Sequence, residues 1–434
     1  MKKLYILLLI LPLLLGSCKK EEVSPITITT ANEAARDALY GLMNDWYLWY
    51  KEMPPVLNTK DYKDPYELLE AVRYKPVDRW SFVIDYNEYI ARFEQGTFVG
   101  HGISIGMDDS KKVRIAKIFN KSNLYSKGVR RGWILKKLNG SDLAQVIISG
   151  NSTLYSQLWG ASQAGVTNTF IFQTPLGKDS TIISAKSTLD MNTVMLKDTL
   201  RLKSGITGHL VFDQFIEPSS AELKTAFAYF KEQNVTDLIL DMRYNGGGLE
   251  LILQELASYI AGNSYTGQPI IKLLCNDKHT TENRNVNFLT TLSPLNLKKL
   301  VVITTRGTAS ASEEVINGLK PMLTVTTIGD TTEGKPTGMS LYTDKNKKFV
   351  FAPVTFEAVN SNDAGGFYDG IPPAKFVPDD ISRDFNDRNE LCLKEAIHFL
   401  ETGTLTAKSA YLKQKVRIIT EEPEWTRNLL ILNK

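Results

Sequence analysis

The feature that most restricts the fold of this chain is the alternation of strand-like and helix-like segments after about residue 195. Apolar runs typical of buried strands recur there, and segments with the spacing of amphipathic helices lie between them. The expected strands are 209–215, 236–242, 300–304 and 325–328, and the expected helices are 219–233, 249–261 and one that begins at Ala309. This order predicts an α/β layer fold in which functional loops follow the strand ends.

The residues before this region predict two further units. The segments 31–50, 64–74 and 87–95 predict a small helical domain, and short β-like runs punctuated by glycine, asparagine and serine predict a β-rich domain. We therefore expect a multidomain chain of the α+β and α/β classes. Its expected parts are a signal peptide over 1–17, a linker over 18–30, a helical domain over 31–97, a β-rich domain over 98–190, an α/β core over 191–400 and an extension over 401–434.

The N-terminus has the features of a bacterial export signal. Lys2 and Lys3 precede an apolar run over 4–15, which is too short to span a bilayer and is typical of a secretory signal peptide. The run ends in LGSC, which resembles a lipobox, so we expect a lipid on Cys18; an ordinary signal that contains a cysteine is the alternative. The next four residues, KKEE, are similar to the surface-sorting signal of some Bacteroidetes lipoproteins, or form a solvated linker. The expected location is the cell envelope, with the protein lipid-anchored to the outer membrane and facing the periplasm or the outside.

Composition excludes several classes of function. The 51 basic and 48 acidic side chains nearly balance, so no nucleic-acid partner is expected. The three cysteines and four histidines show no zinc-ligand spacing, and we expect neither a metal nor another cofactor. Cys275 and Cys392 could form a disulfide, but unpaired cysteines in the core are the preferred interpretation.

The first candidate motif follows the expected strand 236–242. Its sequence DMRYNGGG at 241–248 places three residues without Cβ before a helix, so backbone N–H groups can face an anion or an oxyanion. A dinucleotide site is disfavoured because the pattern G-x-G-x-x-G is absent. Close strand–helix packing without a ligand is the alternative.

The second motif, GTASASE at 307–313, lies at another strand-to-helix junction. A small-residue turn there can expose a serine hydroxyl at the helix N-terminus, where the dipole favours developing negative charge. A serine that only caps the helix is the alternative.

The third motif, GDTTEGKPT at 329–337, nearly matches a phosphate-binding loop, but Pro336 occupies the position that should hold magnesium. A lysine on this tight loop could instead take the proton of a serine hydroxyl. His209 and His279 are the rival bases, although neither lies in a recognisable catalytic turn.

Taken in order, the three motifs resemble the C-terminal processing peptidases, also called tail-specific proteases, which have a helical region, a PDZ domain and an α/β (ClpP/crotonase-like) core. The resemblance implies that Ser310 is the nucleophile and that Lys335, 25 residues later, is the general base. It also implies that the N–H groups of Gly247 and Ala311 form the oxyanion hole and that Ser312 is a packing residue. The sequence DGIPP at 369–373 resembles a turn of the family and supports the fold.

One position departs from the family pattern. The family usually has Gly-Lys-Gly-x-x-Gln, whereas this chain has GKPTGM at 334–339, and Met339 is a poor hydrogen-bond acceptor. The third catalytic group is therefore unassigned. Glu313 and Thr332 are the candidates, and a loss of activity is an open alternative.

The sequence GHGI at 100–103, with the glycine-containing segment at 122–140, resembles a bacterial PDZ domain. Its residues Gly100, His101, Gly102 and Ile103 would bind the C-terminus of a peptide that adds as an edge strand; a generic β-sandwich is the alternative. We therefore expect a lipid-anchored serine endopeptidase that acts on polypeptides. The alternative is a non-catalytic peptide-binding lipoprotein that keeps the protease fold.

Overall fold

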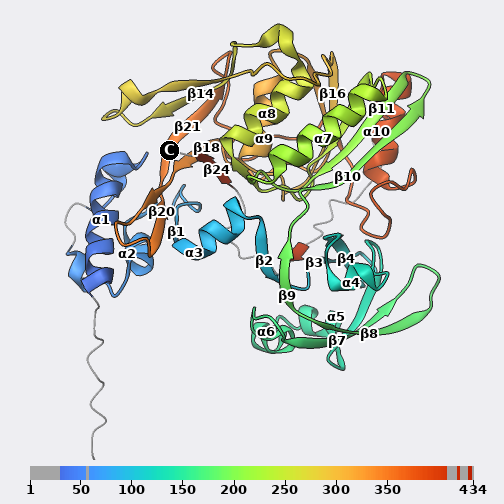
Figure 1. Ribbon diagram of the computed structural model, residues 1–434, viewed down its shortest axis with the longest axis horizontal. Helices are drawn as coiled ribbons and strands as arrows, with labels where there is room; N and C mark the ends of the chain where they lie inside the picture. Colours follow the sequence, from blue (N-terminus) through green and yellow to red (C-terminus); the bar gives the residue numbers. More distant parts are fainter. Residues whose placement is uncertain (1–29, 55–57, 408–417, 421–428, 433–434) are drawn as a thin grey trace, which may run out of the picture.

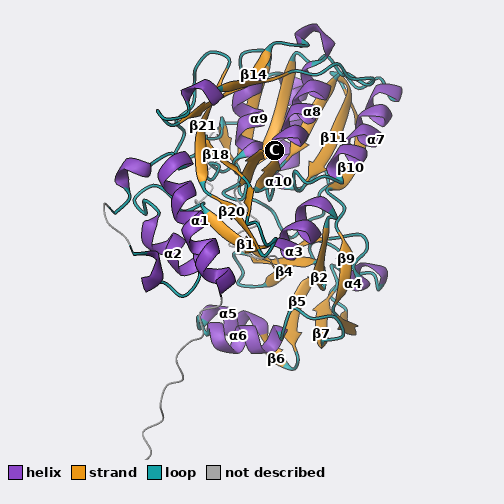
Figure 2. Ribbon diagram, turned by 60° about the vertical axis from the view of Figure 1, so that its left-hand side comes forward, coloured by secondary structure: helices purple, strands orange, loops and turns teal. Residues whose placement is uncertain are grey.

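Three parts of the chain lie side by side in the computed structural model, which describes residues 30–54, 58–407, 418–420 and 429–432 (Figure 1). N-terminal helices and a β-rich module both lie beside an α/β core, and Figure 2 shows the same arrangement from a second direction. The predicted signal peptide, Cys18 and the rest of the predicted linker up to residue 29 lie outside the described residues, and residue 30, predicted as the end of the linker, begins α1. No helix in the part of the chain that the structure describes is long and apolar enough to cross a membrane.

The core contains a six-stranded sheet with apolar side chains on both faces. Its strands, in spatial order, are β10 (Val194–Leu202), β11 (Gly205–Phe212), β12 (Asp237–Asp241), β16 (Lys299–Thr304), β17 (Thr324–Gly329) and β22 (Lys375–Phe376). Neighbours are parallel except β10 and β11. Because successive side chains point to opposite faces, Leu238 and Leu240 of β12 join one apolar cluster and Ile239 joins another.

Helices cover both faces of this sheet, as the predicted α/β layer fold requires. The cluster that holds Leu238 includes residues of α7 (Ser219–Glu232), α8 (Glu250–Ala261) and α9 (Ala311–Leu319). The opposite cluster includes residues of α10 (Leu391–Thr402). The α/β prediction is therefore confirmed, and each expected strand and helix of this region is present within a few residues of its predicted ends.

A second six-stranded sheet lies beside the first and contains a strand from the end of the chain. Its order is β13 (Gly247–Leu249), β24 (Leu429–Leu432), β18 (Thr337–Ser340), β21 (Val354–Asn360), β14 (Pro269–Cys275) and β15 (Arg284–Asn287). The strand β24 is parallel to both of its neighbours, β13 and β18. The short helices η4 (Asn263–Tyr265) and η5 (Thr280–Glu282) flank β14.

The N-terminal part is mainly helical, as expected. It contains α1 (Thr30–Trp46), η1 (Tyr50–Glu52), η2 (Thr59–Asp61), α2 (Pro65–Val72), α3 (Tyr86–Tyr89) and a π-helical turn, η3 (Ile90–Glu94). The start of α2 has a local cause, because the Asp64 carboxylate accepts from the Glu67 N–H and Pro65 occupies the first helical position.

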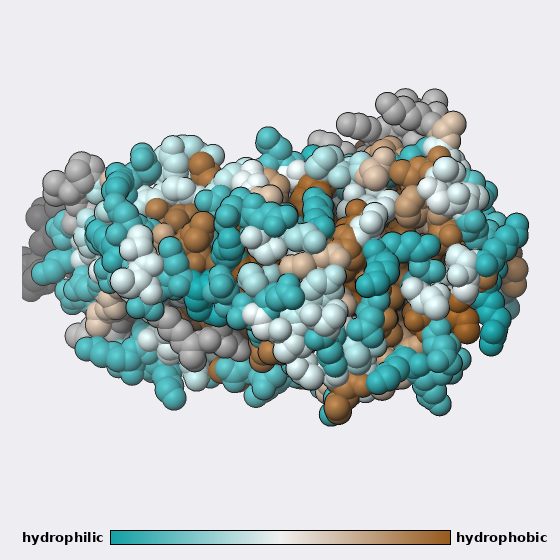
Figure 3. All heavy atoms as spheres, turned by 90° about the horizontal axis from the view of Figure 1, so that it is seen from above, coloured by the Kyte–Doolittle hydropathy of each residue, from teal (hydrophilic) through white to brown (hydrophobic). Residues whose placement is uncertain are grey.

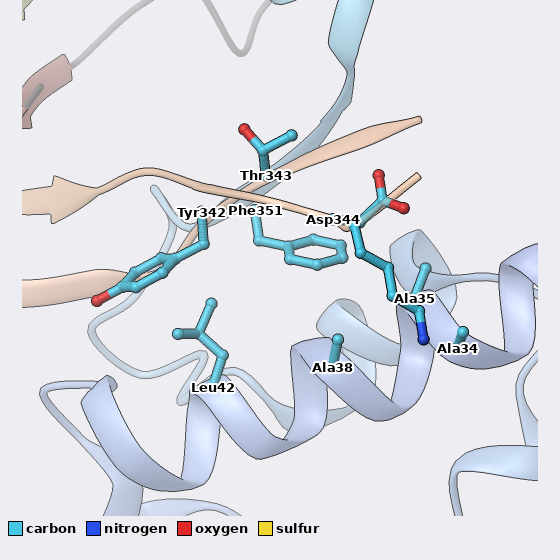
Figure 4. A pocket seen from close by; sticks show the side chains of 9 residues that line it. Ala34, Ala35, Ala38, Leu42, Tyr342, Thr343, Asp344 and Phe351 are labelled. Carbon is cyan, nitrogen blue, oxygen red and sulfur yellow. The ribbon is translucent and has the colours of Figure 1, made fainter. Parts of the chain in front are cut away.

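This part also contributes a strand that we did not expect. The strand β1 (Phe82–Asp85) pairs with β20 (Phe349–Ala352), which also pairs with β19 (Tyr342–Thr343). Figure 4 shows how α1 packs on this small sheet: Ala38 and Leu42 face Phe351 and Tyr342 across a hollow. The N-terminal part and the α/β core therefore share one hydrophobic core.

The β-rich module has a hydrophobic core of its own. Its sheet has the order β23 (Ile418–Thr420), β3 (Ile103–Met107), β4 (Val113–Ile118), β5 (Ile134–Leu138), β7 (Thr167–Gln173) and β8 (Asp179–Ala185), with β6 (Ser141–Asp142) paired to β5. The helices α4 (Asn123–Ser126), α5 (Leu143–Ile148) and α6 (Ser152–Trp159) accompany this sheet. A ribbon of β2 (Thr97–Gly100) and β9 (Ser187–Asp190) runs between the module and the core (Figure 1).

Cys275 and Cys392 do not form a disulfide with each other. Cys392 is buried in α10, as expected for a cysteine of the core, whereas Cys275 ends β14 and is only half-buried. Figure 3 shows polar side chains over most of the upper face, with smaller apolar areas between them.

Candidate active site

Ser310 lies at the start of α9, in a turn that the first glycine motif holds in place. Its φ of 58° and ψ of −115° are unusual for a residue with a Cβ, and such strain persists only where the surroundings fix the backbone. Here Asn245 provides that support, because its carbonyl oxygen accepts from the Ala309 N–H and the Ser312 hydroxyl, both at 3.0 Å. The predicted packing role of Ser312 agrees with this contact.

The Ser310 hydroxyl forms no hydrogen bond with the residues that the structure describes. The side chain is fully buried, and its Oγ has no hydrogen-bond partner among the residues that the structure describes. Ser310 and Lys335 are therefore not hydrogen-bonded to each other in this state.

Glu313 connects the serine turn with the lysine loop. Its Oε2 accepts from the N–H groups of Ser310 (2.7 Å) and Lys335 (2.9 Å). Its Oε1 accepts from the Gly334 N–H (2.7 Å) and the Thr332 hydroxyl (2.5 Å). Burial raises the pKa of Glu313, but an oxygen pair that accepts four hydrogen bonds is suited to the ionised form. Both predicted supporting residues thus lie at the junction, where they position the two loops.

These contacts also show that the segment 329–337 is not a phosphate-binding loop. The N–H groups of Gly334 and Lys335 donate to a carboxylate, so they are not available to a phosphate. Gly334 is required here, because it has a φ of +96° and a Cβ would lie 2.3 Å from the carbonyl oxygen of Tyr368. The Thr332 hydroxyl accepts from the Ile371 N–H at 2.7 Å, which ties in the predicted turn at 369–373.

Lys335 is completely buried, and burial lowers its pKa to about 7. The negative charges of Asp78, Glu313 and Glu333 act in the opposite direction but do not outweigh the loss of hydration. The Nζ lies 3.8 Å from the Sδ of Met339, which occupies the position of the usual family glutamine. An amine with a pKa near 7 is partly neutral at physiological pH, so Lys335 can accept a proton.

Two residues of this site come from the N-terminal part, and we did not predict them. Trp80 places its ring centroid 5.8 Å from Lys335 Nζ, and the carboxylate of Asp78 raises the lysine pKa. Asp78 is buried, and accepts from the Tyr47 hydroxyl at 2.7 Å and from the Trp80 and Ser81 N–H groups, both at 2.9 Å. No local sequence signal identifies these residues, because they approach the lysine only through the tertiary fold.

The two predicted oxyanion donors differ in their present hydrogen bonding. The Ala311 N–H lies at the first position of α9, where an α-helix offers it no intrahelical acceptor. The Gly247 N–H donates to Asn245 Oδ1 at 2.9 Å. The next residue must be glycine, because a Cβ on Gly248 would lie 2.0 Å from the carbonyl oxygen of Phe215. One donor is therefore available and the other must exchange its partner before it can bind an oxyanion.

A buried ion-pair cluster fixes the other end of this glycine loop. Arg243 pairs with Asp241 (2.7 Å) and with Asp379 (2.6 Å). Arg131 of the β-rich module reaches the same place, where it donates to Asp379 and to the Tyr244 hydroxyl. The module is thus directly connected to the loop that carries Gly247.

The histidines do not form a triad with the serine. All four lie in described residues, and none can be hydrogen-bonded to Ser310, whose Oγ has no partner. His209 is buried within β11, where burial lowers its pKa to about 4, and His279 stacks on Trp46. No group of three or more His, Cys, Asp or Glu side chains that could hold a metal occurs within the described ranges.

The four predicted peptide-binding residues lie together at the start of β3. Gly100 ends β2 and Ile103 begins β3, while Gly102 has a φ of +73°. The His101 side chain does not face a ligand, because it is buried and its Nε2 bonds Asn168 Oδ1 at 2.8 Å. The edge of β3 pairs with β23 of the same chain.

Known proteins resemble this chain in sequence and in fold. Residues 206–373 match peptidase family S41, and residues 34–82 match the peptidase S41 N-terminal domain. The carboxy-terminal processing protease CtpB of Bacillus subtilis (strain 168) is 24% identical over 242 residues, which cover 56% of this chain and 47% of that protein. The chain thus matches about half the length of that relative.

Solved structures support the same fold. An S41 protease structure from Bacteroides fragilis NCTC 9343 has a TM-score of 0.69 at 21% identity and covers 85% of this chain and 97% of its own. The photosystem II D1 C-terminal processing protease has a TM-score of 0.50 at 18% identity, over 84% of this chain and 96% of its own. The chain therefore belongs to peptidase family S41, the family of serine-type C-terminal processing peptidases.

Proposed function

We propose that this protein is a serine endopeptidase that cleaves polypeptides, with Ser310 as the nucleophile and Lys335 as the general base. The observation that supports this most strongly is the arrangement around Glu313. One buried carboxylate holds the backbone of the strained serine and the backbone of a lysine whose pKa is lowered to about 7. A serine beside a neutral amine is a pair suited to acyl transfer.

The reaction follows from these groups. Ser310 Oγ attacks the carbonyl carbon of the scissile bond while its proton passes to Lys335 Nζ. The N–H groups of Ala311 and Gly247 donate to the oxyanion of the tetrahedral intermediate, the latter after it leaves Asn245 Oδ1. When the C–N bond breaks, the protonated lysine gives its proton to the leaving amine and an acyl-enzyme remains. Water then attacks this ester, with Lys335 again as the base, and Ser310 is released.

We assign the β-rich module to substrate capture and Cys18 to the membrane. The loop at 100–103 leads directly into β3, whose two sides are paired with β4 and β23. A peptide that took the place of β23 along β3 would gain main-chain hydrogen bonds, as in PDZ domains. A lipid on Cys18 would hold the catalytic core at the outer membrane of the cell envelope, on its periplasmic or its outer face. Both assignments are consistent with the proposed protease, whose substrates would be polypeptide segments.

Labelling with a fluorophosphonate probe tests the catalytic part of the proposal. The wild-type protein should be labelled on Ser310, and Ser310→Ala should abolish labelling. Ser312→Ala is the matched control. Ser312 donates to the Asn245 carbonyl oxygen and is not the proposed nucleophile, so this variant should still be labelled on Ser310. Labelling that persists in Ser310→Ala would contradict the assignment.

The second candidate function is that of a non-catalytic peptide-binding lipoprotein. Two observations favour it: Ser310 Oγ has no partner, and Met339 lies where the family glutamine would orient the lysine. Peptide binding without any probe labelling or turnover would establish this alternative.

A further inference from the structure

Glu314 is a completely buried carboxyl group one helical turn after the proposed nucleophile. Its N–H donates to the Ser310 carbonyl oxygen at 2.8 Å, so the two residues are about 6 Å apart along the axis at the start of α9. Neither carboxyl oxygen of Glu314 has a hydrogen-bond partner among the residues that the structure describes. Such a group lowers the free energy of unfolding, and a ligand that supplies the missing partner would remove that cost.

Thr337 is a second buried polar side chain near the proposed base. It is completely buried, and its Oγ1 forms no hydrogen bond with a described residue. Thr337 begins β18 two residues after Lys335, and side chains alternate along an extended chain, so the two lie on the same side of it. The contact of Lys335 Nζ with Met339 Sδ, at 3.8 Å, places the amine along this side of the strand. Thr337 therefore lies on the side of β18 that carries the proposed base.

Glu357 brings a second carboxyl group to the same side of the sheet. It is opposite Thr337 in the antiparallel pair of β18 and β21, and side chains of opposite residues share one face. The strand β21 is joined to α9, because Asn360 Nδ2 donates to the Asn317 carbonyl oxygen at 3.1 Å. The negative charge of Glu357 acts across this junction on Glu314 and raises its pKa. Glu314, Thr337 and Glu357 therefore form one polar cluster between α9 and the β18–β21 pair.

The cluster is acidic and has no balancing cation among the described residues. Burial raises the pKa of Glu314 well above its ordinary value, the charges of Glu313 and Glu357 raise it further, and no lysine or arginine acts on it. Asn317 lowers the pKa of Glu314, but its amide nitrogen already donates to the Ala364 carbonyl oxygen at 2.8 Å. Burial also raises the pKa of Glu357. A bound cation would supply both the missing positive charge and the missing hydrogen-bond donors.

We propose that this cluster binds the side chain of the P1 residue, whose carbonyl carbon Ser310 attacks, and that it selects lysine or arginine. The inference rests on the proposed function for the reaction and adds the substrate class to it. A separation of about 6 Å along α9 is within reach of a long side chain that starts beside the scissile carbonyl. An apolar side chain would leave the buried acceptors unpaired, whereas an ammonium or guanidinium group donates to them. Ser310 is itself completely buried, so the approach of any substrate already requires an opening beside this cluster.

A series of peptides that differ only at P1 tests this with the wild-type protein. Fluorogenic peptides with lysine, arginine, leucine or norleucine at P1 are compared, because norleucine keeps the stem of lysine and lacks its amine. We expect kcat/KM at neutral pH to be at least about 100-fold higher for lysine and arginine, since a site that hydrogen-bonds a substrate group discriminates against an analogue without it. Equal or higher values for leucine and norleucine would overturn the proposal.

Glu314→Leu should remove this preference. An apolar side chain there cannot accept from an ammonium group, so kcat/KM for the lysine peptide should fall at least about 100-fold while that for norleucine is retained. The matched control is Glu255→Leu: Glu255 lies in α8, its Oε2 also has no partner among the described residues, and burial also raises its pKa. Its Oε1 accepts from the Ser220 hydroxyl of α7 at 2.9 Å, so the control should keep the wild-type ratio of lysine to norleucine. The same ratio in both variants would show that Glu314 does not bind the P1 side chain.

Binding to Ser310→Ala separates this inference from the proposed function. By isothermal titration calorimetry, the lysine peptide should bind at least about tenfold more tightly than the norleucine peptide. Its binding should also release protons, because the cation lets the carboxyl groups ionise, and heats in two buffers of different ionisation enthalpy measure this release. If no form of the protein cleaves peptides, tighter binding of lysine with proton release still supports the cluster as a subsite while the protease proposal fails. Equal binding of the two peptides would refute the subsite even in an active enzyme.

Discussion

Replacing Lys335 by methionine should abolish turnover and make the protein more stable. Methionine keeps the length and apolar stem of lysine but cannot accept a proton, so the nucleophile loses its base. Lys335→Arg should be equally inactive, because a guanidinium does not deprotonate near neutral pH. In the wild type, kcat/KM should rise with pH through one ionisation near 7, as the protonated amine becomes neutral.

The gain in stability can be worked out from the pKa. A fall from 10.5 to about 7 corresponds to a cost of about 5 kcal/mol for the buried charged amine, at ~1.36 kcal/mol per pKa unit. Below pH 7 the amine is charged in both the folded and the unfolded state, so the full cost is present. As pH rises from 7 to 10.5, the folded state holds fewer protons than the unfolded state, and the cost disappears. Lys335→Met should therefore raise the free energy of unfolding by up to about 5 kcal/mol at pH 6, and by far less near pH 10.5.

Urea denaturation at pH 6 and at pH 10 measures this difference, and an unfolded labelled protein serves as the substrate for kcat/KM. Lys121→Met is the matched control, since Lys121 and Asp190 form an ion pair in which both side chains are more than half exposed. It should change neither activity nor the pH dependence of stability. If Lys335→Met destabilises the protein at pH 6, or Lys335→Arg retains turnover, the assignment of a buried neutral base is refuted.

Three other substitutions test separate parts of the structure. Asp78→Asn removes a charge that raises the lysine pKa, so the midpoint of the pH–rate profile should move to lower pH; an unchanged midpoint would contradict the electrostatic contact. Gly102→Val would place a Cβ 2.8 Å from Leu189 Cδ1 at a φ of +73°, which should distort the loop at 100–103. Peptides with free C-termini should then bind at least tenfold more weakly, as measured by fluorescence anisotropy, and an unchanged affinity would show that this loop is not part of the binding site. Cys18→Ala should release the protein from membranes in cell fractionation without changing its melting temperature, because Cys18 precedes every described element; partition with membranes as in the wild type would rule out the lipid anchor.

Local patterns were sufficient for the strands and helices of the core. The centres of these strands, 238–240 and 300–303, are uninterrupted apolar runs, which is what parallel strands covered by helices on both faces require. The assignment of Ser310 and Lys335 came from the resemblance of the motifs, and of their 25-residue separation, to the family. In the fold, Ser310 follows β16 and Lys335 follows β17, which are parallel neighbours.

The features that we did not predict depend on contacts between segments far apart in the sequence or on the geometry of a folded loop. The strand β1 has four residues and pairs with β20, more than 260 positions later, so no local alternation identifies it. The positions of β23 and β24 depend on edges that β3, β13 and β18 present in space. The hydrogen bond of the Gly247 N–H with Asn245 Oδ1 is likewise a property of the folded loop.

The role of Glu313 shows how this site meets two conflicting requirements. To act as the proposed base, the lysine must stay close to neutral, yet its loop must be fixed relative to the proposed nucleophile. A carboxylate is the strongest available acceptor for that purpose. A bare carboxylate near Lys335 would raise the lysine pKa and keep the amine charged. Here four donors satisfy the carboxylate, and none of them is the lysine ammonium group. Glu313 therefore positions the loop through the Lys335 backbone N–H. Its negative charge acts to raise the lysine pKa, but burial outweighs it and lowers that pKa to about 7.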